Sequence, residues 1–177
     1  MKKILAGAGL LCASAFVIQA QQQKAQPVPQ QTGEAKVSYR EEGSVLPPLR
    51  VIDGKMNEYT EKSFRNDHHF FMFLFNPTCG HCIDMAKLMG AHADEFKKNH
   101  VLFLAGPAMM PYLGHFFQAS GIDKHPEIKV GIDSASAVDR LYNYRMLPQV
   151  NIYDKDRKLV KIFYGDVPLD SLKKYVP

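Results

Sequence analysis

The sequence is poor in cysteine, with three in 177 residues. Cys12 lies in an apolar N-terminal stretch, which leaves Cys79 and Cys82 for the rest of the chain. Two cysteines are too few for the disulfide framework of a small secreted scaffold. They also lack the second pair that a zinc ribbon needs. With 46% hydrophobic residues, the chain can instead form a single core without covalent staples.

The sequence also lacks a strong charge of either sign. Its formal net charge is +4, and two of the basic residues, Lys2 and Lys3, stand at the extreme N-terminus. This balance gives no argument for binding to nucleic acid or to an anionic membrane surface. Beyond the N-terminal stretch there is no apolar run approaching the ~18 residues of a membrane span, and there is no internal repeat.

Residues 1–20 have the pattern of a secretory signal. A positive start is followed by an apolar stretch over residues 4–18 and by a small residue, Ala20, before the expected cleavage point. The apolar stretch is short for a membrane span, so a cleaved signal is favoured over an uncleaved anchor. Cys12 raises a lipoprotein alternative, which is disfavoured because Leu11 precedes it where such signals carry a small residue.

The remaining chain divides into a tether and one folded domain. Residues 21–42 are rich in Gln and Pro at their start and poor in large apolar groups, so we expect a flexible tether. Residues 43–177 have the length and composition of a single domain.

Within that domain, short apolar segments alternate with helical patterns. This order predicts an α/β fold, with a central mixed sheet flanked by helices. We expect strands at residues 49–52, 70–75, 101–105, 128–132, 150–153 and 159–164, and helices at 79–96, 112–119 and 169–175. The last two strands should form an antiparallel hairpin around the polar turn 154–157. The segment 134–144 is predicted to be a short helix or an irregular connection.

The motif NPTCGHC, residues 76–82, follows the apolar run FFMFLF. That run shows no alternation, as expected of a strand buried on both faces. After it, apolar residues recur at spacings of four and three, which predicts an amphipathic helix beginning at the cysteine pair. These residues are Cys82, Ala86, Met89, Ala93 and Phe96.

Two cysteines on the first turn of a helix can exchange disulfides. Backbone amides and the helix dipole stabilise a thiolate on the first, so Cys79 is the expected nucleophile. Protonated His81 would add a positive charge that favours this thiolate. Cys82, on the inward face, would resolve the mixed disulfide. Gly80 leaves room where another protein chain must approach.

The cysteine pair has three other interpretations. A structural disulfide would close so small a loop that it gives little chain-entropy stabilisation. Cys79, Cys82 and a histidine could hold Cu(I), which would make the chain a copper-binding or copper-delivery module. The domain could also be a redox-inert interaction module, although the intact cysteine pair disfavours this.

The same residues resemble the active site of the thioredoxin superfamily, and CGHC is the motif typical of protein disulfide isomerase domains. MLPQVNIYD, residues 146–154, is similar to the family segment in which a cis-proline precedes a core strand, with Pro148 opposite the cysteines. LRVIDGK, residues 49–55, resembles the opening hairpin of secreted bacterial thioredoxin-like reductases. Gly165 falls where the family usually has a glycine.

The resemblance implies a thioredoxin fold with an N-terminal extension and an insertion before the cis-Pro strand. It implies a thiol-disulfide oxidoreductase in the periplasm of a Gram-negative bacterium, acting on protein substrates. The substrate backbone would pair beside Leu147, with Pro148, Gly80 and Pro77 completing the binding surface. No organic cofactor or metal is expected, because the electrons reside in the cysteine pair, and a redox partner must reset that pair.

The sequence departs from the family pattern at two positions. Thr78 stands where many members carry tryptophan. Phe73 stands six residues before Cys79, where thioredoxin itself has an acid. The sequence therefore shows no buried carboxylate to take the proton of Cys82, so either another group or water serves or efficient reduction is not the role.

Overall fold

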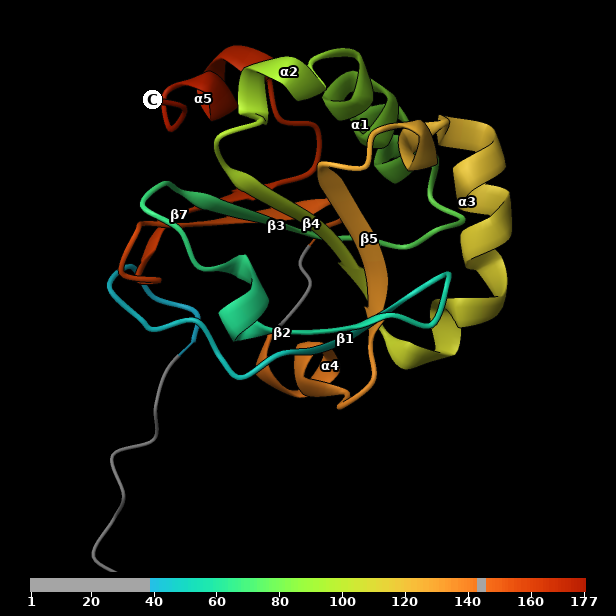
Figure 1. Cartoon of the computed structure of the whole chain (residues 1–177), viewed down its shortest axis with the longest axis horizontal. Helices are drawn as coiled ribbons and strands as arrows, with labels where there is room; N and C mark the ends of the chain where they lie inside the picture. Colours follow the sequence, from blue (N-terminus) through green and yellow to red (C-terminus); the bar gives the residue numbers. More distant parts are fainter. Residues whose placement is uncertain (1–38, 143–145) are drawn as a thin grey trace, which may run out of the picture. The chain divides into compact units, whose positions relative to one another are not determined.

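The computed structural model describes residues 39–142 and 146–177 (Figure 1). The expected signal, residues 1–20, and the expected tether up to residue 38 lie outside the described residues. Among the helices in the described ranges, none is long and apolar enough to cross a membrane.

The centre of the fold is a mixed sheet of seven strands in the order β2-β1-β5-β4-β3-β6-β7. Strand β3 is parallel to β4 and antiparallel to β6, and the hairpin β6–β7 is antiparallel. The predicted α/β class and C-terminal hairpin are therefore confirmed. The strands are β1 (Arg50–Asp53), β2 (Glu58–Thr60), β3 (Phe70–Leu74), β4 (His100–Ala105), β5 (Ile128–Asp133), β6 (Gln149–Tyr153) and β7 (Leu159–Tyr164).

Strand β3 is buried on both faces, as its unbroken apolar run predicts. All five of its residues are fully buried. Phe71 and Phe73 point into one core, whereas Phe70, Met72 and Leu74 point into the other. The strand thus divides the hydrophobic interior into two layers.

Helices cover both faces of the sheet (Figure 1). The layer that contains Phe73 is covered by α1 (Gly80–Ala91), α2 (Ala93–Phe96), α3 (Leu113–Ser120) and α5 (Leu169–Lys173). The opposite layer is covered by α4 (Ala137–Leu141), by the 3-10 helix η1 (Glu61–Phe64) and by the segment around Leu46 and Leu49. The cysteine pair belongs to the first layer.

Four features differ from the sequence-based expectation. The helix predicted over residues 79–96 breaks at His92, whose ψ of 18° is not helical and whose ring contacts Glu95 at the start of α2. A 3-10 helix, η2 (Pro107–Tyr112), precedes α3. Strand β2 was missed because its residues, EYT, are polar and partly exposed. The last helix, α5, ends two residues earlier than expected.

The region between β4 and β6 contains η2, α3, η3 (Ile122–Lys124), β5 and α4. Helix α3 ends at Gly121, whose φ of 68° is the left-handed conformation that glycine adopts readily at a helix end. Both α3 and η3 pack against α1. The inserted elements therefore support the helix that carries the cysteines.

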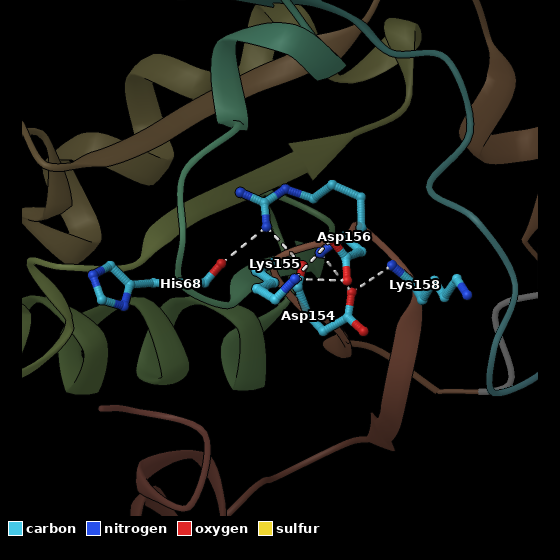
Figure 2. A network of polar contacts seen from close by, with 6 residues as sticks. His68, Asp154, Lys155, Asp156 and Lys158 are labelled. Atoms are coloured by element: carbon cyan, nitrogen blue, oxygen red, sulfur yellow. Dashed lines mark hydrogen bonds and ion pairs between the residues drawn. The ribbon is translucent and has the colours of Figure 1, made fainter.

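The buried side chain of Arg157 connects the β6–β7 turn to the segment before β3 by hydrogen bonds. Arg157 is 3% exposed, and its guanidinium donates hydrogen bonds to the carbonyl oxygens of Phe64, His68 and Asp154 and to Asn66 Oδ1. Figure 2 shows the carbonyl of His68 facing this turn. The turn and the entry to β3 are thus held by one side chain.

We predict that Arg157→Met lowers the free energy of unfolding by about 2–4 kcal/mol, because it leaves buried carbonyl groups without donors. Urea denaturation followed by circular dichroism measures the change. The matched control is Lys158→Met, which removes the same charge from an exposed neighbouring position and should stay within about 0.5 kcal/mol. Equal stability of the two variants would contradict the structural role of Arg157.

Candidate active site

The loop that leaves β3 is folded by Asn76. Its side-chain Oδ1 accepts hydrogen bonds from the Thr78 backbone N–H and hydroxyl, both at 2.9 Å. Its carbonyl oxygen accepts the N–H of Cys79 at 3.0 Å. These bonds form a compact turn of the kind that asparagine favours, and the turn delivers Cys79 to the start of α1.

Cys79 is the N-cap residue of α1, with φ −84° and ψ 124°. Its carbonyl oxygen accepts the N–H of Ile83 at 3.0 Å, and its side chain is partly exposed. The N-terminus of a helix favours negative charge because its first amides lack helical partners and the dipole is positive there. Cys79 therefore occupies the position in α1 that best supports a thiolate.

Cys82 has the opposite environment. Its side chain is fully buried, on the face of α1 that packs into the core. Burial raises the pKa of the Cys82 thiol to about 12; the neighbouring Cys79 and the charge of Asp166 add to the rise, and the Asn76 backbone N–H opposes it. At neutral pH Cys82 is therefore a protonated thiol.

Phe73 lies in the same core as Cys82, where its ring stacks on that of Phe103 with centroids 4.5 Å apart and an interplanar angle of 6°. An aromatic stack thus occupies the position at which the thioredoxin resemblance places an acid. A proton acceptor for Cys82 has to come from another part of the chain or from solvent.

The peptide bond between Leu147 and Pro148 is cis, which confirms the isomer that the sequence resemblance implies. Pro148 is buried, and its carbonyl oxygen accepts the N–H of Gly165 at 2.8 Å. Gly165 has φ 73°, and a Cβ there would lie 2.6 Å from Met146 Sδ. Glycine is therefore favoured for its left-handed conformation, and a larger residue would also displace the exposed Met146 side chain.

Asp166 is the residue that sequence reasoning missed. Its Oδ1 lies 3.0 Å from Nδ1 of His81, and both side chains are largely exposed. The pair links the first turn of α1 to the turn between β7 and α5. Asp166 directly follows Gly165, which the resemblance had singled out, and this adjacency was the available signal.

The remaining predicted site residues lie as follows. Leu147 is partly buried and contacts both cores. Gly80 is exposed, with open space where a Cβ would stand. Pro77 is buried. Within residues 39–142 and 146–177, there is no group of three or more His, Cys, Asp or Glu side chains arranged to hold a metal ion.

Several solved structures have a fold similar to that of this chain. The thioredoxin domain of a thiol-disulfide oxidoreductase from Bacteroides vulgatus has a TM-score of 0.63 at 17% identity, covering 77% of this chain and 99% of that one. A candidate protein disulfide isomerase from Bacteroides thetaiotaomicron has a TM-score of 0.63 at 14% identity, covering 76% of this chain and 86% of that one. A candidate thiol:disulfide interchange protein from Chlorobium tepidum has a TM-score of 0.61 at 18% identity, covering 76% and 94%.

The chain has the thioredoxin fold. No protein-family model matches the sequence, and no curated protein matches it significantly. The likeness is therefore one of structure, and the roles of individual residues rest on the geometry of the site. In this thioredoxin fold, the CGHC turn, the cis-proline loop and the turn at Gly165 are joined by hydrogen bonds.

We predict that iodoacetamide near neutral pH modifies one thiol of the reduced, folded protein, and that this thiol is Cys79. Cys82 is buried, and its pKa of about 12 keeps it protonated until the solution becomes strongly alkaline. Mass spectrometry of full-length protein carrying Cys12→Ser measures the modification. In denaturant both cysteines should react, and equal rates in the folded protein would contradict the asymmetry.

Proposed function

We propose that this chain is a thiol-disulfide oxidoreductase that exchanges disulfides with protein substrates. The observation that carries the proposal is the asymmetry of two thiols at one helix start. Cys79 is partly exposed at the N-cap, whereas Cys82, three residues later, is fully buried with a raised pKa. One thiol is placed for attack from solvent and the other for resolution from within.

The reaction follows from this placement. In the reducing direction the Cys79 thiolate attacks a sulfur of the substrate disulfide, which forms a mixed disulfide and releases one substrate thiol. Cys82 then attacks the Cys79 sulfur, which forms the Cys79–Cys82 disulfide and releases the second substrate thiol. In the oxidising direction the same bonds form and break in reverse. A redox partner resets the pair, and no organic cofactor or metal is needed.

The substrate surface is formed by the loops around the pair. We assign the backbone of Leu147 to pairing with an extended substrate segment, beside the cis-linked Pro148. The open space over Gly80 admits the substrate chain. Met146, 60% exposed, extends this surface with an apolar group.

The proposed place of action is the periplasm of a Gram-negative bacterium. The support is the signal-like pattern of residues 1–20, which lie outside the described residues. Disulfides form and persist in such oxidising compartments, where a cysteine pair of this kind has substrates.

Substitution of each cysteine tests the assignment. We predict that Cys79→Ser abolishes the reduction of insulin disulfides by the protein in the presence of dithiothreitol, because the attacking thiolate is lost. Cys82→Ser should accumulate mixed disulfides, visible on non-reducing gels, because the resolving thiol is lost. Thermal melts check that both variants fold. Undiminished insulin reduction by the Cys79→Ser variant would overturn the function.

The reduction potential tests the contribution of His81. A positive charge beside Cys79 stabilises the reduced form and makes the couple more oxidising, so we predict that His81→Gln shifts the potential to a more negative value. Equilibration with glutathione at defined ratios measures the shift. A wild-type reduction potential of about −180 mV is expected if the protein acts as an oxidase or isomerase, and one of about −270 mV if it acts as a reductase. His115→Gln, at an exposed position on α3, is the matched control, and equal potentials in the two variants would contradict the charge argument.

A further inference from the structure

Asp166 and His81 form an ion pair at the rim of the active site. Their side chains are 71% and 68% exposed, and the distance between Asp166 Oδ1 and His81 Nδ1 is 3.0 Å. An exposed pair of this kind contributes little to stability. Its significance lies instead in which segments it joins, because His81 stands between the two cysteines of the proposed exchange site.

The backbone on both sides of Asp166 is anchored. The N–H of Gly165 donates to the carbonyl of Pro148 at 2.8 Å. On the other side, Val167 is 4% exposed and belongs to the same core as Cys82. These two anchors fix the Asp166 backbone near the cysteine pair. The charge of its carboxylate contributes to the raised pKa of Cys82.

The resolving step requires a base. Cys82 must lose its proton before it can attack, and burial holds that proton firmly. The groups that act directly on its sulfur are Cys79 and the backbone N–H of Asn76. In the mixed disulfide neither of them can accept a proton, and Phe73, which belongs to the same core as Cys82, is apolar.

We propose that Asp166 is a positioning residue for the exchange reaction: its carboxylate accepts Nδ1–H of His81, so that Nε2 of His81 is the proton acceptor for Cys82. This inference rests on the proposed function and assigns the group that its resolving step needs. The carboxylate fixes both the orientation of the ring and the tautomer that leaves Nε2 without a proton.

The protons and sulfurs balance in both steps. When Cys79 attacks, the first substrate thiolate leaves and takes a proton from the His81 imidazolium. The neutral imidazole then takes the Cys82 proton at Nε2, and the Cys82 thiolate attacks the Cys79 sulfur. The bond between Cys79 and the substrate breaks as the Cys79–Cys82 bond forms, and the second substrate thiolate takes the proton from His81.

A positioning role for Asp166 and a purely electrostatic effect of its charge predict opposite changes in the rate of the resolving step. As a negative charge alone, Asp166 disfavours the Cys82 thiolate, so its neutralisation would accelerate resolution. As a positioning residue it accelerates resolution, so its neutralisation slows that step. A rate measurement on the resolving step separates the two.

Reaction with 5,5′-dithiobis(2-nitrobenzoate) isolates that step. In reduced full-length protein carrying Cys12→Ser, attack by Cys79 releases the first thionitrobenzoate at a rate proportional to reagent concentration. Attack by Cys82 on the resulting mixed disulfide releases the second at a rate independent of that concentration. Thionitrobenzoate leaves without needing a proton, so the exposed His81 imidazolium gives its proton to solvent instead. The second rate then reports the deprotonation and attack of Cys82.

We predict that Asp166→Asn slows the second release at least about tenfold, within the range for loss of an acid–base group, and leaves the first release within about threefold. The asparagine amide can donate to Nδ1, which puts the proton on Nε2 and blocks it as an acceptor. The matched control, Asp67→Asn, removes the same charge from the loop before β3, at the far end of the strand from the cysteines, and should leave both rates unchanged.

A double-mutant cycle tests whether Asp166 acts through His81. His81→Gln should slow the second release about as much as Asp166→Asn does, and the double variant should be no slower than His81→Gln alone. Full additivity of the two effects, or an accelerated second release in Asp166→Asn, would overturn the positioning role. An unchanged second release would overturn it as well.

The first release keeps this test separate from the proposed function. A first release in the unsubstituted protein no faster than that of a free thiol such as glutathione would overturn the exchange function itself. A rapid first release, together with an unaltered second release in Asp166→Asn, would overturn only the role of Asp166.

Discussion

The geometry of the candidate active site depends on the burial of β3 on both of its faces. All five residues of this strand are inaccessible, so the chain must leave the sheet at the first polar residues that follow it. Asn76 makes that exit, and its hydrogen bonds to Thr78 and Cys79 turn the chain directly into α1. The helix then packs back over the strand, which buries Cys82 and leaves Cys79 at the rim. The different environments of the two thiols are thus a consequence of strand burial.

Two hydrogen bonds assemble the rest of the site from distant parts of the sequence. Gly165 donates to the carbonyl of Pro148, and Asp166 contacts His81. They connect the turn after β7 to the cis-proline loop and to the first turn of α1. The left-handed conformation of Gly165 disfavours any other residue, and a Cβ there would displace the side chain of Met146. The geometry of the rim therefore depends on one glycine as much as on the cysteines.

Sequence reasoning predicted the features that local pattern encodes. The apolar run of β3, the helical periodicity after Cys82 and the glycine that ends α3 each signal their element within a short window. It missed β2, whose residues are polar, and the break at His92, because it placed Gly90, two residues earlier, within one continuous helix. It missed Asp166 for a different reason: the carboxylate and His81 are far apart along the chain, and their meeting follows only from the packing of β7 beside β6.

The placement of a base at the rim is consistent with the composition of the core. A carboxylate in place of Phe73 would stand in the aromatic stack with Phe103, where an unpaired charge is strongly disfavoured. His81 and Asp166 remain largely in solvent, so the fold buries neither charge. Of His81, Asp166 and Cys82, only the Cys82 thiol is buried, and burial favours its neutral, protonated form. The proposed mechanism thus places proton transfer at the rim and the resolving sulfur in the core, so that the face of the sheet in the same core as Cys82 can stay apolar.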